Sequence, residues 1–286
     1  MQLSEKTIEE LKAYLATRED VSLAYLFGSQ AKGTATNESD VDIGVYFKPA
    51  GRALEYETTF DYPAEEVILR DVERIVQGEV DFVVLNKVPT TLFFAVLDEG
   101  KPLLVRDQSL WWRLYLTISD AAEFFRSYIH SFALISARSR SLSDVDRARL
   151  AQLVDYLAKE LEDWPTFQSV SQRGYTEDRS VKRNLERWAE MLSITSIDMA
   201  KILVASEKLA MPKTYKDVVG KLAFVKSFDE KMAASLEEFA QMRNLLAHEY
   251  LDIRFQQLRK FIDKGEPAYR YLLHFVRARL TDQSDG

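Results

Sequence analysis

The segment at residues 26–47 constrains the fold of this chain more than any other, and it reads LFGSQAKGTATNESDVDIGVYF. It predicts an apolar strand, a Gly-Ser turn, a small polar loop, and a second strand that opens with Asp40 and Asp42. Because successive side chains of a strand point to opposite faces, these two carboxylates project from the same face. Carboxylates so close repel each other, and a hard divalent cation such as Mg²⁺, which prefers oxygen ligands, relieves that repulsion.

The turn between the two strands adds a second kind of binding group. Gly28 and Ser29 stand where the first strand ends. Backbone amides that a glycine turn frees ahead of a helix can hold phosphate. A phosphate-binding turn together with a pair of metal-binding carboxylates indicates nucleotide chemistry.

The composition narrows the class of protein. The 286 residues suffice for two domains, each able to bury a core. The formal net charge of -7 excludes a global basic field, so any nucleic-acid role needs a local patch. The absence of cysteine removes disulfides, zinc thiolates and thiol catalysis. Apolar runs are short and the N-terminus lacks a signal-peptide core, so we expect a soluble, cytoplasmic protein with no membrane contact.

The first hundred residues predict alternating helices and strands. Asp81 lies among the apolar residues of the third predicted strand. Residues 49–62 contain glycine and proline without a firm period, which suits a mobile connection near the nucleotide. Helices are expected at residues 4–17, 67–76 and 89–99, and strands at 21–27, 41–47, 79–85 and 102–106.

After Ser109 the sequence predicts helices only. Aromatic residues at helical intervals indicate a helix that links two halves, and a polar, serine-rich run follows it. Ser227 and Glu230 form a predicted capping box, and Gly265-Glu266-Pro267 is expected to separate two helices. The expected fold class is α+β, with a mixed sheet and helices at residues 1–107, a helical linker and boundary at 108–146, and an all-helical bundle at 147–286.

Ten residues separate Gly28-Ser29 from Asp40-Val41-Asp42. This pattern resembles the signature of the DNA-polymerase-β-like nucleotidyltransferases. The longer string GSQAKGTATNESDVD is similar to their minimal nucleotidyltransferase (MNT) subfamily. This resemblance implies that Gly28 and Ser29 hold the terminal phosphates of ATP, and that Asp40 and Asp42 bind two Mg²⁺ ions. It also implies that Asp81 supplies the third carboxylate.

Nucleotidyl transfer itself explains why such residues would stand together. A hydroxyl must lie in line with the α-phosphorus, pyrophosphate must leave on the opposite side, and charge must be neutralised on both oxygens. Asp81 is also placed to accept the hydroxyl proton. That role requires the third strand to lie beside the second.

A second motif stands in the helical half, where residues 242–251 read MRNLLAHEYL. Here Arg243, His248 and Tyr250 are spaced as Arg-x4-His-x-Tyr, and this pattern resembles the Arg-x4-6-His signature of HEPN domains. The resemblance implies that Arg243 and His248 contribute to metal-independent RNA cleavage, in a site shared across a homodimer formed by the HEPN domain. Asn244, one helical turn before His248, shares its face and would orient the imidazole or a phosphate.

Together the two halves resemble a fusion of an MNT antitoxin with a HEPN ribonuclease toxin. The resemblance implies an ATP- and Mg²⁺-dependent transfer of AMP onto Tyr250, which silences the ribonuclease. Two alternatives stay open at this point. In the first alternative, the chain is a small-molecule nucleotidyltransferase of the aminoglycoside type with a helical substrate domain. In the second, its helical half is a non-catalytic RNA- or nucleotide-binding dimerisation module.

Overall fold

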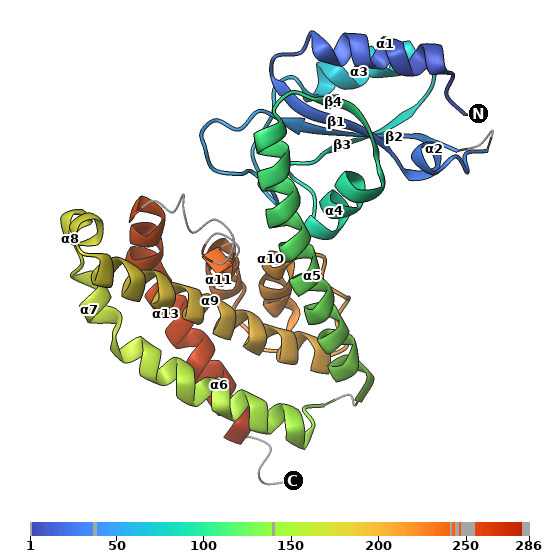
Figure 1. The fold of residues 1–286 in the computed structure, drawn as a ribbon. Helices are drawn as coiled ribbons and strands as arrows, with labels where there is room; N and C mark the ends of the chain where they lie inside the picture. The colour runs from blue at the N-terminus through green and yellow to red at the C-terminus, as the bar shows by residue number, and fades with distance from the viewer. Residues whose placement is uncertain are drawn as a thin grey trace. The chain divides into compact units, whose positions relative to one another are not determined.

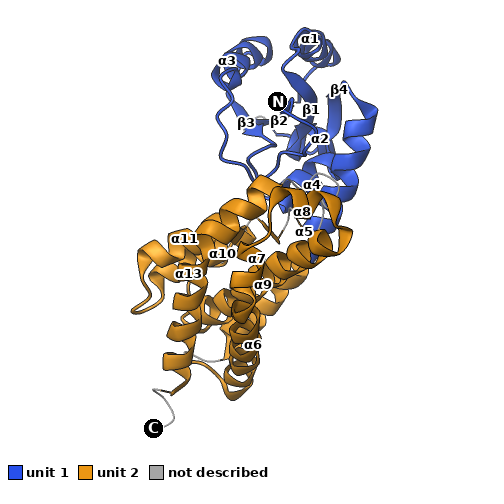
Figure 2. Ribbon diagram, turned by 90° about the vertical axis from the view of Figure 1, so that its left-hand side faces the viewer, with its two compact units in different colours: residues 1–124 blue, residues 125–286 orange. Residues whose placement is uncertain are grey.

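A computed structural model of the chain describes residues 2–36, 39–138, 141–240, 242–243, 246 and 255–281. The chain divides into two compact units, residues 1–124 and 125–286 (Figure 2). The division falls within helix α5 (Gln108–Arg138). The domain boundaries expected at residues 107 and 146 stay a prediction. Among the helices that the structure describes, none combines the length and the apolar run that a membrane span needs.

Unit 1 is built on a four-stranded sheet with the order β3-β2-β1-β4 (Figure 1). Strand β1 pairs antiparallel with both β2 and β4, whereas β2 and β3 are parallel. This confirms the expected mixed sheet. The strands are β1 (Val21–Phe27), β2 (Val41–Phe47), β3 (Val80–Val84) and β4 (Lys101–Val105).

Helices cover both faces of this sheet, because each central strand is apolar on both sides. Helices α1 (Glu5–Ala16) and α3 (Glu65–Val76) pack on one face, where Leu11, Ile68 and Ile43 share a buried cluster. Helix α4 (Thr90–Glu99) lies on the other face, where Phe93 packs with Tyr25. Figure 1 shows α1 and α3 together on one side and α4 on the opposite side.

Glu55 makes several of the hydrogen bonds that hold the connection after β2. Glu55 accepts hydrogen bonds from the Ala50 amide at 3.0 Å and the Tyr62 hydroxyl at 2.8 Å. Its own amide donates to the Tyr46 hydroxyl at 3.0 Å. The connection begins at the end of β2 opposite to Asp40, whereas the sequence predicted a connection near the nucleotide.

The described elements of unit 2 are helical, as expected. Its core gathers large aromatic residues, among them Trp164, Trp188, Phe261 and Tyr269. The helices are α6 (Asp144–Glu162), α7 (Trp164–Gln168), α8 (Gln172–Glu177), α9 (Arg179–Ser206), α10 (Tyr215–Gly220), the 3-10 helix η1 (Lys221–Phe224), α11 (Glu230–Ala240) and α13 (Phe255–Thr281).

Two local predictions for unit 2 were wrong. Helix α13 runs unbroken through Gly265-Glu266-Pro267. A Cβ atom at Gly265 would lie 3.3 Å from Cη2 of Trp164, so this glycine lets the helix pack closely on the core instead of ending it. The cap of α11 is Asp229, whose carboxylate accepts from the amides of Lys231 and Met232 at 2.9 and 3.0 Å. An Asp side chain one residue before the helix satisfies these free amides, a role that had been predicted for Ser227.

Candidate functional site

Three aspartates meet at one end of the sheet in unit 1. Asp40 directly precedes β2, and Asp42 is the second residue of that strand. Asp81 is the second residue of β3, and the parallel register pairs it directly with Asp42. Strand β3 is therefore the neighbour of β2, which is the arrangement that the proposed role of Asp81 requires.

The electrostatics of Asp42 reflect this proximity. Burial raises the pKa of the Asp42 carboxyl, and the charges of Asp81 and Asp40 raise it further. Asp42 is half-buried, while the other two side chains are exposed. A cation bound beside Asp42 would offset the negative charges of Asp81 and Asp40 that disfavour its ionised form.

The Gly-Ser turn lies directly against Asp42. In the pairing of β1 with β2, Phe27 is opposite Asp42, so the next residue, Gly28, begins helix α2 (Gly28–Lys32) beside the acid. Gly28 has a φ of +63°, and a Cβ atom there would lie 2.1 Å from Oδ2 of Asp42. The position therefore requires glycine both for its backbone conformation and for space. Ser29 follows in the first turn of α2 and is half-buried.

Further contacts fix the segments that flank the turn. The Lys32 ammonium pairs with Glu99 of α4 at 2.6 Å, and the buried Gln30 accepts from the Leu3 amide at 3.1 Å. Before Asp40, the Thr36 amide donates to the Ser39 hydroxyl oxygen at 2.9 Å, and the Ser39 amide donates back to the Thr36 carbonyl at 3.2 Å. Sequence analysis missed these hydrogen bonds between Thr36 and Ser39, although Ser and Thr side chains commonly bond to nearby backbone groups.

The donor set fits a magnesium ion by its chemistry. The three aspartates offer only carboxylate oxygens, the donors that Mg²⁺ prefers. As placed, no three His, Cys, Asp or Glu side chains of the described ranges are gathered closely enough to hold a metal ion. Asp40 and Asp81 are exposed, so their side chains are free to rotate between staggered positions toward Asp42.

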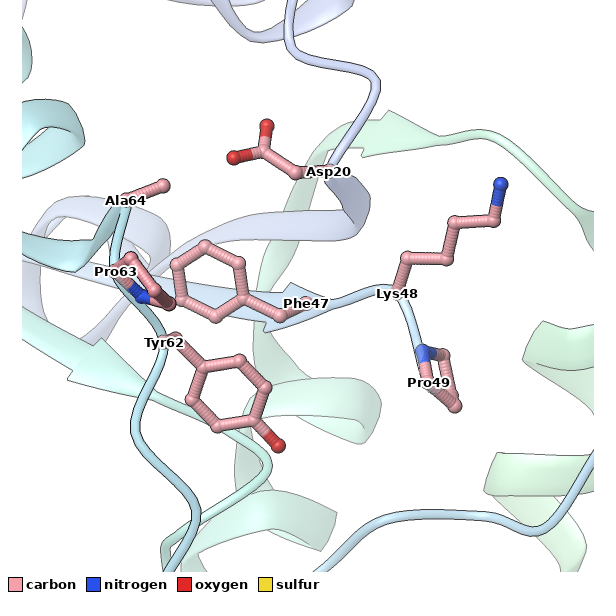
Figure 3. A pocket seen from close by; sticks show the side chains of 7 residues that line it. All are labelled: Asp20, Phe47, Lys48, Pro49, Tyr62, Pro63 and Ala64. Carbon is pink, nitrogen blue, oxygen red and sulfur yellow. The ribbon is translucent and has the colours of Figure 1, made fainter. Parts of the chain in front are cut away.

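A separate pocket of about 290 Å³ opens at the other end of β2 (Figure 3). Its wall includes the Tyr62 ring, which stacks on Phe47 with a centroid distance of 4.8 Å and an interplanar angle of 10°. None of the three site aspartates lines it. The residues around it are Asp20, Phe47, Lys48, Pro49, Tyr62, Pro63 and Ala64.

Of the motif in unit 2, the structure describes Arg243. This residue is helical and half-buried, and its guanidinium carbon lies 4.7 Å from the centre of the Tyr215 ring. The other predicted residues of this site, Asn244, His248 and Tyr250, lie outside the described residues. Their roles stay predictions.

In comparisons with known proteins, each unit contains one match to a family model. Residues 9–109 match the family model described as polymerase beta, nucleotidyltransferase, and residues 149–276 match the model described as ribonuclease HepT-like. A search of curated protein sequences finds no match.

Solved structures also resemble part of the chain. A crystal structure of a toxin-antitoxin with AMP-PNP is 24% identical over 45% of this chain and 94% of its own, with a TM-score of 0.36. A tyrosine-to-alanine mutant of the toxin-antitoxin MntA-HpeT is 25% identical over 46% of this chain and 94% of its own, with a TM-score of 0.35.

Proposed function

Because the chain joins a nucleotidyltransferase domain of the polymerase β family to a HepT-like ribonuclease domain, we propose that it is a fused toxin-antitoxin protein that controls its own ribonuclease. In this proposal unit 1 transfers AMP from ATP to Tyr250 of the helical half. The observation that carries the transferase part is the register that pairs Asp42 with Asp81 beside Gly28.

The site residues of unit 1 would have different roles in the transfer of AMP. Asp40, Asp42 and Asp81 would hold Mg²⁺, which when bound neutralises charge on the attacking and leaving oxygens. The backbone at Gly28 and Ser29 would grip the terminal phosphates.

Asp81, at the exposed edge of the site, would accept the proton of the attacking tyrosine hydroxyl. The tyrosine oxygen then forms a bond to the α-phosphorus as the bond from that phosphorus to the bridging oxygen breaks. Pyrophosphate leaves with the electron pair of the broken bond.

The helical unit would cleave RNA without a metal. His248 would take the proton of a ribose 2′-hydroxyl, and Arg243 would stabilise the charge that develops on the phosphate. The 2′-oxygen would form a bond to the phosphorus as the bond from that phosphorus to the 5′-oxygen breaks, and the 5′-oxygen would leave with the electron pair and take a proton from water. Asn244 would orient the imidazole or the phosphate. A homodimer formed by this unit would complete the site. Because the proposed reactions need ATP and RNA, the protein would act in the cytoplasm.

Modification of Tyr250 would silence that cleavage. Tyr250 is two residues from His248, so an AMP group on its oxygen adds a negative charge and bulk where an RNA phosphate must bind. Because both halves share one chain, the tether raises their effective concentration whenever it can span the two sites.

Intact-mass spectrometry of the purified chain tests the transfer. Incubation with ATP and Mg²⁺ is expected to add increments of about 329 Da, the mass of an AMP group added by phosphoryl transfer. The Asp42→Asn variant is expected to gain none, and Tyr250→Phe to lose the increment that peptide mapping assigns to that residue. An unmodified wild-type mass, or equal modification of Asp42→Asn, would reject the proposal.

The two alternatives predict different products. A small-molecule transferase would move labelled AMP to an aminoglycoside and leave the protein unlabelled, although the HepT-like match favours a ribonuclease in the helical half. A non-catalytic module would leave RNA intact. Loss of RNA cleavage in Arg243→Ala and in His248→Ala would exclude that second alternative.

A further inference from the structure

The guanidinium of Arg243 rests on an aromatic ring. Its central carbon lies 4.7 Å from the centre of the Tyr215 ring. A cation within about 6 Å of a ring centre is attracted by the negative face of the ring. Arg243 belongs to the proposed ribonuclease motif, so whatever holds its side chain also sets where its charge stands.

Tyr215 is itself held rigidly. It is the first residue of α10, and only 6% of its surface is exposed. Its ring meets Phe125 edge to face at 5.1 Å and 88°, and Tyr128 at 5.1 Å and 76°. The Tyr128 hydroxyl donates to the carbonyl of Ile197 at 3.0 Å, which anchors this cluster to α9. A ring fixed on two sides by other rings has little freedom to move with the arginine.

The approach of α10 to α11 brings the two residues together. A Cβ atom at Gly220, the last residue of α10, would lie 2.9 Å from the Glu237 carboxylate, so the two helices pack closely there. Arg243 comes three residues after Ala240, the last residue of α11. This close packing holds α10 against α11, and Tyr215 at the first residue of α10 lies against the Arg243 guanidinium.

We propose that Tyr215 is a positioning residue for the RNA-cleaving site, and that its ring holds the Arg243 guanidinium where an RNA phosphate binds. This inference rests on the proposed ribonuclease function. An aromatic ring suits the task because its negative face attracts the guanidinium, and its flat surface fixes the orientation of the guanidinium plane. Tyr215 does not touch the RNA in this account.

Three variants of the full-length chain separate positioning from general stability. Tyr215→Phe keeps the ring, whereas Tyr215→Leu removes it. Phe275→Leu is the matched control, because the Phe275 ring lies 5.8 Å from the Arg279 guanidinium carbon in the same unit. We expect cleavage of a single-stranded RNA to fall about tenfold in Tyr215→Leu, equivalent to about 1.4 kcal/mol, and to change little in Tyr215→Phe and Phe275→Leu.

A measurement on Arg243 itself does not depend on activity. In protein labelled with ¹⁵N-arginine, the Nε–Hε resonance of Arg243, assigned by its loss in Arg243→Lys, is expected to be shifted upfield by the ring. It is also expected to show Overhauser contacts to the Tyr215 ring protons in the unmutated chain. The upfield shift is expected to persist in Tyr215→Phe and to vanish in Tyr215→Leu.

The outcomes separate the positioning role of Tyr215 from the ribonuclease function of the helical unit. Absence of the Overhauser contacts in the wild type, or an Arg243 resonance that Tyr215→Leu leaves unchanged, would overturn the positioning role whatever the activity. A cleavage defect as large in Phe275→Leu as in Tyr215→Leu would also overturn it. A wild-type chain that cleaves no RNA would reject the ribonuclease function, and with it the role of Tyr215 in RNA cleavage, whereas the resonance would still report the contact.

Discussion

A Cβ atom on Gly28 would lie 2.1 Å from the carboxylate oxygen Oδ2 of Asp42. The turn after β1 and the acid on β2 therefore occupy adjoining space with no room for a side chain between them. The φ of +63° at Gly28 adds a second demand, because residues with a Cβ atom pay about 1 kcal/mol or more in this region. The turn and the acid behave as one unit, and a change in one displaces the other.

Substitution of Gly28 by alanine is expected to abolish most AMP transfer. The new methyl group must displace the Asp42 carboxylate, and a displacement of about 1 Å in a catalytic group lowers a rate about 100-fold. Gly33→Ala is the matched control, since Gly33 has a φ of +69° but open space around its Cβ position. Transfer is measured with α-³²P-labelled ATP. Equal activity in the two variants would contradict the steric account.

The raised pKa of Asp42 predicts a pH-dependent stability. Burial and the charges of Asp81 and Asp40 raise this pKa in the folded state, so the folded chain binds more protons than the unfolded chain. Stability therefore declines as pH rises from the ordinary Asp pKa of about 3.9 through the raised value. Asp42→Asn removes this penalty and is expected to melt at a higher temperature at pH 7, with the gain vanishing below about pH 3.9.

Melting curves across this pH range, without divalent cations, test the prediction. Asp61→Asn serves as the control because Asp61 is an exposed aspartate in the same unit. Addition of Mg²⁺ at pH 7 is expected to raise the melting temperature of the wild type but not of Asp42→Asn, since a ligand that binds only the folded state stabilises it. A melting temperature of Asp42→Asn equal to that of the wild type at pH 7 would show that the site carries no charge penalty.

Asn86 is expected to be essential for the stability of the main chain at Phe47, where β2 ends. Its fully buried side chain accepts from the Phe47 amide at 2.8 Å and donates to the Phe47 carbonyl at 3.2 Å. Asn86→Ala leaves both main-chain groups unsatisfied, which costs about 2–4 kcal/mol. Hydrogen exchange of peptides from β2 is expected to accelerate by the corresponding factor. The exposed Asn184→Ala is the control, and unchanged exchange in Asn86→Ala would refute the prediction.

Replacement of Pro267 by alanine is expected to stabilise unit 2. Pro267 lies inside α13, where it cannot donate the hydrogen bond that residue 267 would make to the carbonyl of Asp263. Restoring that donor is worth about 1–3 kcal/mol. Calorimetry of the unit 2 transition measures the gain. Pro165→Ala is the comparison, because Pro165 stands in the first turn of α7 where its missing amide has no helical partner. A lower transition temperature in Pro267→Ala would contradict this account.

Local patterns sufficed for the elements of unit 1, and they did not suffice for the contacts between them. The strands and the pair of Asp40 and Asp42 follow from alternation and spacing along a few residues. The partner of Asp42 does not, because whether β3 lies beside β2 is decided by the crossover through α3 and by the packing of the whole sheet. The close approach of Gly28 to Asp42, which leaves no room for a Cβ atom, likewise depends on the pairing of β1 with β2.

In unit 2, tertiary packing overrode local signals. Gly265 and Pro267 are typical of a break between helices, yet the helix continues because its faces on both sides of Gly265 are buried against the core around Trp164. The contact of Arg243 with Tyr215 joins residues 28 positions apart, and no periodicity in the sequence indicates it.

The sheet of unit 1 is complete once β4 ends at Val105, and this has a consequence for the order of events during synthesis. Domains fold largely as they emerge, the N-terminal one first, at about 5–20 residues per second. The roughly 140 residues between Val105 and Arg243 therefore give unit 1 a lead of about 7–28 s. On the proposed function, each ribosome would deliver a folded transferase before the last residues of the ribonuclease motif exist. The order of the two units along the chain would thus protect the cell's RNA from the newly made ribonuclease.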